Sequence, residues 1–198
     1  MTLETSKLRL EDNWFEQAFQ LLQRTNLFVI ASSGKDLQWF GSYLAQFAAS
    51  KGSTEIGSLY GNHINTLDDY CYQLCRSIPW GFEMGRNINA VNDVLRNFNT
   101  YPDRRFLFWF DAQHLLTFDE HLFIELADAM NGVSAEYEFA TPDTETKVLQ
   151  RNCFMLTGKT GDDLTLFKKW NGSFWAEVTG QPKPNVSILE ILPNRGAP

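Results

Sequence analysis

The sequence lacks most of the patterns by which enzymes are recognised. It contains no HExxH, CxxC or GxSxG motif, so metalloproteases, redox dithiols and serine hydrolases of those types have no support. Only three histidines occur, His63, His114 and His121, and too few further ligands lie near them in sequence for a metal site. We therefore expect no catalytic residue, no metal and no cofactor, and a domain that binds rather than catalyses.

Basic charge is also scarce. The 17 Lys and Arg are outnumbered by 24 Asp and Glu, which gives a net charge of −7, so the basic footprint of a nucleic-acid-binding protein is missing. No apolar run approaches the roughly 20 residues of a membrane span, and residues 1–12 lack the apolar core of a signal peptide. We expect a cytoplasmic protein, bound to neither nucleic acid nor membrane, whose protein partner is basic.

Cysteine is limited to three residues, an odd number without the spacing of a disulfide framework. Cys71 and Cys75 lie four residues apart, on one face of an expected helix, and Cys153 lies in an apolar run. We interpret all three as thiols in a reducing compartment.

Apolar residues are plentiful, at 43% with 16 Phe and 6 Trp, so the 198 residues can form one domain with a large core. Five short apolar runs predict strands: residues 26–31, 54–60, 106–110, 153–156 and 186–192. Segments with helical spacing alternate with them: residues 13–24, 36–51, 66–78, 89–98 and one that begins at Thr117. This alternation predicts a single α/β domain, with a mainly parallel sheet and helices packed on its faces.

Several helix ends are also predicted. Asp36 is expected to start its helix, and Gly52 to end it. Thr66 with Asp69 approximates a capping box, and Thr117 is expected to cap the helix that follows it. Residues 134–150 are left open, residues 162–170 are expected to form a short helix, and residues from 193 onward a loose tail.

One stretch has the spacing of a known family. Residues 85–95 read GRNINAVNDVL, preceded by Asp69-Tyr70 and followed by Tyr101-Pro102. Over residues 59–109 this pattern resembles the barstar family of intracellular ribonuclease inhibitors. Asn89 stands where that family has an aspartate, whereas Asp93 is kept. An acidic helix preceded by a loop can fill a cationic cleft, because its carboxylates mimic phosphate.

The barstar resemblance implies a basic partner, such as a ribonuclease, bound through the 80–93 loop and helix. The residues expected to bind it are Trp80, Phe82, Glu83, Asn87, Asn89, Asn92 and Asp93. It also implies three parts: an N-terminal helix–strand–helix unit (1–53), a barstar-like core (54–159), and an extension with a final strand (160–198). The alternative is that Asn87 only caps the helix and that Asp93 is a solvated charge.

A second resemblance covers more of the chain. Residues 29–36 read VIASSGKD, between a predicted strand and a helix, as a P-loop does. Residues 106–115 (FLFWFDAQHL) resemble the Walker B strand of AAA-type ATPases, and residues 153–158 (CFMLTG) resemble their sensor 1 strand. Under this interpretation Gly34, Lys35 and Asp111 would bind nucleotide.

The P-loop motifs are degenerate. Val29 occupies the first glycine position, Asp36 replaces the hydroxyl residue that binds Mg²⁺, and Ala112 stands where the catalytic glutamate would be. The resemblance therefore implies a pseudo-ATPase that acts as a scaffold or regulator. The plain alternative is a turn between a strand and a helix.

A third possibility is a subunit of a larger assembly, with Trp170, Phe174 and Trp175 at its interface. The order of the strands in the sheet distinguishes the barstar-like interpretation from the P-loop interpretation. A central 27–31 strand beside the 106–110 strand favours the P-loop layout. A core of 54–60, 106–110 and 153–156, with the N-terminal unit added at an edge, favours the inhibitor.

Overall fold

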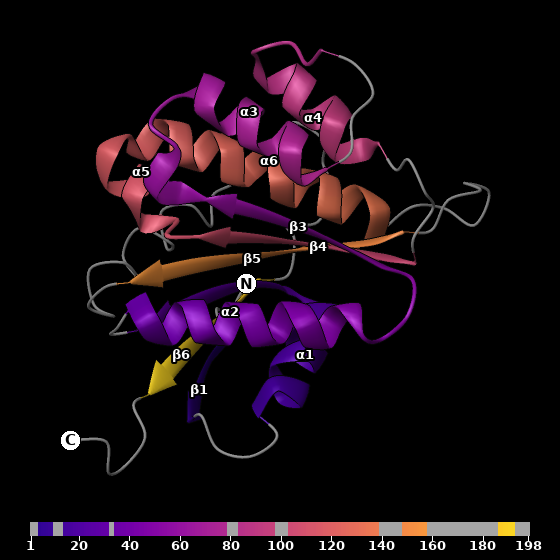
Figure 1. Ribbon diagram of the computed structural model, residues 1–198, viewed down its shortest axis with the longest axis vertical. Helices are drawn as coiled ribbons and strands as arrows, with labels where there is room; N and C mark the ends of the chain where they lie inside the picture. The colour runs from indigo at the N-terminus through magenta and orange to yellow at the C-terminus, as the bar shows by residue number, and fades with distance from the viewer. Residues whose placement is uncertain are drawn as a thin grey trace.

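The computed structural model describes residues 4–9, 14–31, 34–78, 83–97, 103–138, 148–157 and 186–192. They form one six-stranded sheet in the order β1-β6-β2-β5-β4-β3, and every strand pair is parallel (Figure 1). The strands are β1 (Glu4–Arg9), β2 (Asn26–Ala31), β3 (Thr54–Tyr60), β4 (Arg104–Phe110), β5 (Leu149–Thr157) and β6 (Val186–Leu192). The predicted fold class, a single α/β domain with a parallel sheet, is confirmed.

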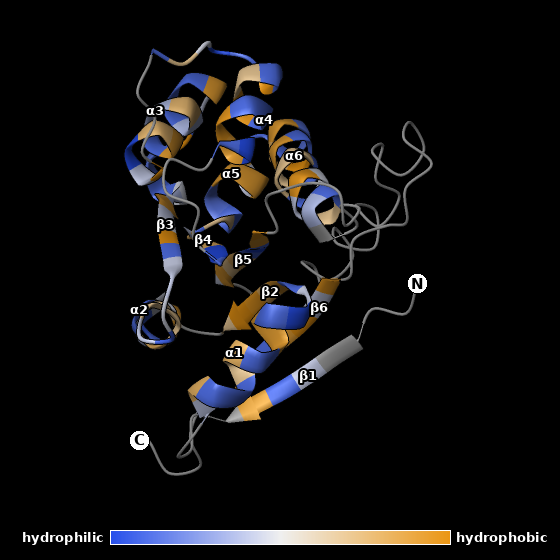
Figure 2. Ribbon diagram, turned by 90° about the vertical axis from the view of Figure 1, so that its right-hand side faces the viewer, coloured by the Kyte–Doolittle hydropathy of each residue, from blue (hydrophilic) through white to orange (hydrophobic). Residues whose placement is uncertain are grey.

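Helices cover both faces of this sheet. They are α1 (Trp14–Arg24), α2 (Gly34–Ala49), α3 (Leu67–Ser77), α4 (Ile88–Arg96), α5 (Gln113–Phe118) and α6 (Glu120–Glu138), with a 3-10 turn η1 (Gly61–His63). Helices α1 and α2 lie on one face, and α3 to α6 lie on the other (Figure 1). The helices carry hydrophobic and hydrophilic bands, as amphipathic helices that cover a sheet do (Figure 2).

The central strands are apolar throughout because both of their faces are covered. In β4, Phe106 and Phe108 point toward α1 and α2, whereas Leu107 and Trp109 point toward the four-helix side. This alternation explains why the predicted strands read as continuous apolar runs. The buried Asn152 of β5 contacts two further elements, β2 and α6. Its backbone N–H donates to Asn26 Oδ1 of β2 (2.9 Å), and its side chain donates to Ser134 Oγ of α6 (2.8 Å).

The strand predictions agree with the structure at 26–31, 54–60 and 186–192, and the other two strands begin earlier than expected. Strand β1 was not predicted. Its residues are polar because it lies at the edge of the sheet, paired with β6 alone. Strand β6 lies between β1 and β2, and β2 lies between β6 and β5, so both strands of the 1–53 segment lie on the β5 side of the sheet, separated by the last strand of the chain.

Two predicted helix starts were wrong. Helix α2 begins at Gly34, which puts Asp36 inside its first turn. Thr117 lies within α5, and the residue before α6 is Asp119, whose Oδ1 accepts from the Leu122 N–H at 3.0 Å. Helix α6 also continues to Glu138, into the region that was left open.

Other helix ends agree with the sequence. Thr66 and Asp69 form the capping box of α3, and Asn87 caps α4. Helix α2 ends at Ala49, three residues before Gly52. The φ angle of Gly52 is 96°, a conformation that favours glycine. Residues 162–170 and the tail from 193 lie outside the described residues.

Candidate functional site

The carboxyl ends of β2, β4 and β5 meet at one edge of the sheet because these strands are parallel. Ligands of open α/β sheets bind at such an edge. Helix α2 begins there, and a Cβ built on Gly34 would lie 3.5 Å from the Thr157 methyl group at the end of β5. The first turn of α2 is therefore in contact range of β5. Asp111, at the end of β4, faces the same edge.

Asp111 lies at a sharp turn from β4 into α5. Its φ angle is 50°, in the left-handed region that aspartate tolerates better than most residues. The Ala112 N–H donates to the Met155 carbonyl oxygen at 2.9 Å, and the His114 N–H donates to the Asp111 carbonyl oxygen at 2.9 Å. Gly61 packs against this turn, since a Cβ there would lie 2.3 Å from the Asp111 carbonyl oxygen.

Gln113 ties the start of α5 to the end of β5. Its Nε2 donates to Thr157 Oγ1, and its Oε1 accepts from the Thr157 N–H at 3.1 Å. The carboxamide thus pairs with both the hydroxyl and the backbone N–H of Thr157. Sequence reasoning missed this pair, because Gln113 and Thr157 are 44 residues apart and no motif links them.

His114, the next residue of α5, contacts the segment that follows η1. Its Nε2 lies 2.9 Å from Asn65 Oδ1, and its ring stacks on Phe118 with 6.3 Å between ring centroids. No group of three His, Cys, Asp or Glu side chains in the described part of the chain is placed to hold a metal.

The remaining P-loop positions differ in exposure. Lys35 is exposed at the start of α2, and Asp36 is half-buried in the first turn. A helix amino terminus attracts anions, and here a carboxylate already lies in that turn. Val29 is fully buried within β2. Ser32 and Ser33, between β2 and α2, are outside the described residues.

The second predicted surface lies on α4. Asn87 accepts from the Ala90 N–H at 2.9 Å and so caps the helix. Asn89 and Asp93, four residues apart, are both exposed on its outer face, and Asn92 is half-buried. Glu83, just before α4, is exposed as well. Trp80 and Phe82 lie outside the described residues.

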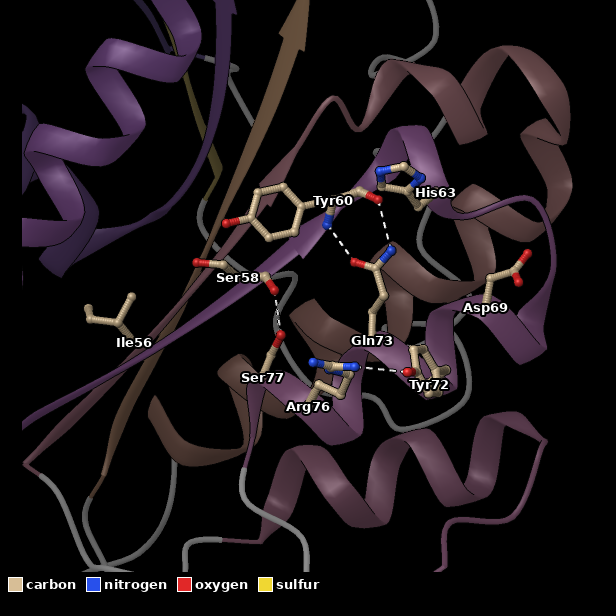
Figure 3. A pocket seen from close by; sticks show the side chains of 9 residues that line it. All are labelled: Ile56, Ser58, Tyr60, His63, Asp69, Tyr72, Gln73, Arg76 and Ser77. Atoms are coloured by element: carbon tan, nitrogen blue, oxygen red, sulfur yellow. Dashed lines mark hydrogen bonds between the residues drawn. The ribbon is translucent and has the colours of Figure 1, made fainter.

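A third feature was not predicted: a groove of about 690 Å³ between the edge strand β3 and helix α3 (Figure 3). The Gln73 side chain accepts from the Tyr60 N–H (2.7 Å) and donates to the Tyr60 carbonyl oxygen (3.0 Å). Ser77 Oγ donates to the Ser58 carbonyl oxygen. These two α3 side chains, four residues apart, occupy part of the open strand edge, which protects it from pairing with another strand.

No family model matches the chain, and no curated protein matches it. Among solved structures, the chain is similar to the Aeropyrum pernix ORC2 protein, determined as ADPNP–ADP complexes, with a TM-score of 0.57 and 12% sequence identity. The match covers 97% of this chain and 50% of that one, so the chain spans about half the length of the ORC2 protein. At this identity the likeness shows a shared fold.

In its fold, this likeness agrees with the layout that the P-loop resemblance implies, and it does not match the barstar resemblance. The sheet order agrees with the P-loop layout in placing β2 centrally. The expected neighbour was wrong, because β5 lies between β2 and β4. The strands β5, β4 and β3 are consecutive and β2 lies at their β5 edge, as the inhibitor hypothesis required, so strand order alone does not separate the two hypotheses. No described helix is long and apolar enough to span a membrane.

Proposed function

We propose that this chain is a non-catalytic, protein-binding domain with a P-loop-type fold, a pseudo-ATPase that acts as a scaffold or regulator. The observation that carries the proposal is at the end of β4, where Asp111 is followed by the fully buried Ala112. The P-loop resemblance places a glutamate at that position. A methyl group cannot orient or deprotonate a water molecule for attack on a phosphate.

The phosphate side of the site supports the same conclusion. The carboxylate of Asp36 lies in the turn of α2 where a P-loop protein binds Mg²⁺ and phosphate. Its charge repels phosphate oxygens, and its position lacks the usual hydroxyl. Val29, in place of glycine, has a buried side chain. On this side only Gly34 and Lys35 match the P-loop pattern.

The main alternative is a chain that binds nucleotide without hydrolysing it, because the similar ORC2 protein was determined with ADPNP and ADP. Binding measurements distinguish this alternative from the proposal. Titration calorimetry with ATP and with ADP, both with Mg²⁺, should give no binding heat. The thermal unfolding transition should be unchanged by 5 mM nucleotide. A nucleotide that bound with a Kd of 50 µM would then be at about 100 times its Kd and would raise the free energy of unfolding by about 2.7 kcal/mol. Heat that disappears in Lys35→Ala would establish nucleotide binding. Phosphate release that disappears in Asp111→Ala would overturn the non-catalytic assignment.

For the partner surface we propose the outer face of α4, where Asn89 and Asp93 are exposed, together with the exposed Glu83 before the helix. Two carboxylates there suit a basic protein. Proteins that co-purify with the tagged chain from its native cell should be lost in Asp93→Ala and kept in Glu125→Ala, a matched change at an exposed acid on α6. Full retention of all partners by Asp93→Ala would contradict this surface, without bearing on the nucleotide result.

A further inference from the structure

The outer face of α2 carries an aromatic strip that continues onto α1. Trp39 and Tyr43 stack with ring centroids 5.4 Å apart, and Trp14 of α1 contacts Tyr43 edge-on at 6.4 Å. On the adjoining turns Phe15 lies 4.9 Å from Phe47. Trp39 is 63% exposed and Tyr43 is 45% exposed. Large aromatic side chains are costly to leave in water and are enriched at the centres of protein interfaces.

The α2 part of this strip lies in an uncharged stretch of sequence, with Lys35 and Asp36 before it and Lys51 over the Phe47 ring after it. From residue 37 to residue 50 the chain has no Asp, Glu, Lys or Arg. The exposed neighbours of Trp39 and Tyr43 within this stretch are Gln38, Ser42 and Gln46, and the exposed Lys35 lies one turn before Trp39. Interface cores are depleted of charged residues in the same way. Elsewhere acids outnumber bases, so two copies of the chain, each with a net charge of −7, repel one another least where they meet through this face.

The face is also complementary to itself. In an antiparallel pair of α2 helices with a two-fold axis at Ser42, each residue at a given distance before Ser42 meets the one at that distance after it. Gln38 then lies opposite the partner copy's residue 46, also glutamine, and amides can both donate and accept. Trp39 lies opposite residue 45, a small alanine. The small Ser42 at the axis allows close approach of the two helices.

Such a pair also separates its like charges. Residue 35 of one copy lies opposite residue 49 of the other, so the two Lys35 side chains are 14 residues apart along the helices, or roughly 21 Å. The helix dipoles are antiparallel, which is favourable. In Figure 1, α2 lies in front of the sheet with α1 packed beside it, so that its outer side faces away from the sheet.

We propose that this aromatic strip is a self-association surface, and that two copies of the chain dimerise through antiparallel α2 helices with Ser42 at the two-fold axis. A helix of 16 residues is about 24 Å long. That is too short to supply alone the roughly 800 Å² per partner of a standard interface, so the rings from α1 contribute and the dimer is weak. This proposal is independent of the nucleotide and α4 proposals.

Sedimentation velocity from 1 to 200 µM protein tests the dimer. The wild-type chain should shift reversibly from 22.7 kDa to twice that mass, with a Kd in the range of tens of micromolar. Ser42→Asp should weaken dimerisation at least tenfold, because it places two like charges at the axis. The matched variant Gln20→Glu, which adds the same charge on an exposed face of α1, should change the Kd less than twofold.

Mixing makes the test specific for a two-fold axis. Ser42→Asp and Ser42→Lys should each be mainly monomeric alone at 100 µM and should form a 1:1 dimer when combined, since the charges at the axis are then opposite. Circular dichroism of each variant checks that it is folded. A wild-type chain that stays monomeric to 200 µM would overturn the proposal. So would a dimer that Ser42→Asp does not weaken, or variants whose mixture does not restore association.

Discussion

Arg105 is the one charged side chain with no solvent exposure among the described residues, and its contacts hold three elements together. Its guanidinium donates to the Glu55 carboxylate of β3 (2.9 Å), to the Leu95 carbonyl oxygen at the end of α4 (2.9 Å), and to the Asn97 carbonyl oxygen. Burial lowers the pKa of Arg105, and the carboxylate of Glu55 raises it. The pairing therefore lets a cation stay charged inside the fold.

Removal of this cation should be strongly destabilising. Arg105→Met keeps much of the buried volume but leaves Glu55 and two carbonyl oxygens without their donor. We expect the free energy of unfolding to fall by about 3–5 kcal/mol, measured by urea denaturation. Arg104→Met, at the half-buried neighbouring position, should cost less than about 1 kcal/mol. Equal losses in the two variants would contradict this role of Arg105.

The cysteines make a second prediction at the scale of single residues. Burial, together with Cys75 and Asp68 nearby, raises the pKa of Cys71 to about 11 from 9.0. Burial also raises the pKa of Cys75 and of Cys153. At pH 8 the thiolate fraction of Cys71 is then about a hundredfold lower than for an ordinary thiol. Iodoacetamide should therefore label the folded chain slowly, and the urea-unfolded chain rapidly, as followed by mass spectrometry. Rapid labelling of Cys71 in the folded chain would contradict this.

Among the elements, α3 depends on the most complete cap. Asp69 Oδ2 accepts from the Asn65 N–H (3.0 Å), from the Thr66 hydroxyl (2.9 Å) and from the Thr66 N–H (3.0 Å). These hydrogen bonds, the Asn65 one first, lower the pKa of Asp69 below its ordinary value of 3.8. A lowered pKa in the folded state means that the ionised carboxylate stabilises the fold at neutral pH. This contribution is lost as the pH falls from about 4 through the folded-state pKa.

Asp69→Asn should therefore cost a few tenths of a kcal/mol up to about 1 kcal/mol at pH 7, and its difference from the wild-type chain should shrink at pH 3. Urea denaturation at the two pH values measures this. Thr66→Ala, which removes the acceptor of the Asp69 N–H, should be destabilising at both. A difference for Asp69→Asn that grows on acidification would contradict the sign worked out here.

Local signals account for what could be predicted at this scale. The Thr66 cap and the Asn87 cap were readable because a polar residue three positions before its N–H partner is a short-range pattern. The apolar strands were readable because both sheet faces are covered. Thr117 misled, since Asp119, two residues on, takes the cap of α6. Strand β1 was unreadable because an edge strand in contact with solvent has no apolar run.

The candidate site was predictable only in part for a related reason. The positions of Gly34 and Lys35 at the start of α2, and of Asp111 after β4, followed from motif spacing. The Gln113–Thr157 pair and the Gln73–Tyr60 contact arise from strand order, which the sequence does not encode in any local pattern. The groove between β3 and α3 depends on β3 being the sheet edge, a property of the assembled sheet.

For the whole molecule, strand order decides which parts can be removed. Strand β6 lies inside the sheet and pairs with both β1 and β2, although it comes last in the chain. Ile188 and Leu189 of β6 are buried on opposite faces. A chain cut after residue 185 should therefore lose two strand pairings and expose β2 on one edge, and it should fail to unfold cooperatively.

A chain that starts at residue 10 is the matched comparison. It loses β1, which pairs only with β6 at the sheet edge, so it should stay folded with reduced stability. Thermal unfolding followed by circular dichroism distinguishes the two truncations. If the part from residue 54 to residue 159 can fold without the last strand, the first truncation should instead show a cooperative transition. That result would show that β6 is dispensable. The stability of the sheet would then depend mainly on β5, β4 and β3 and not on all six strands.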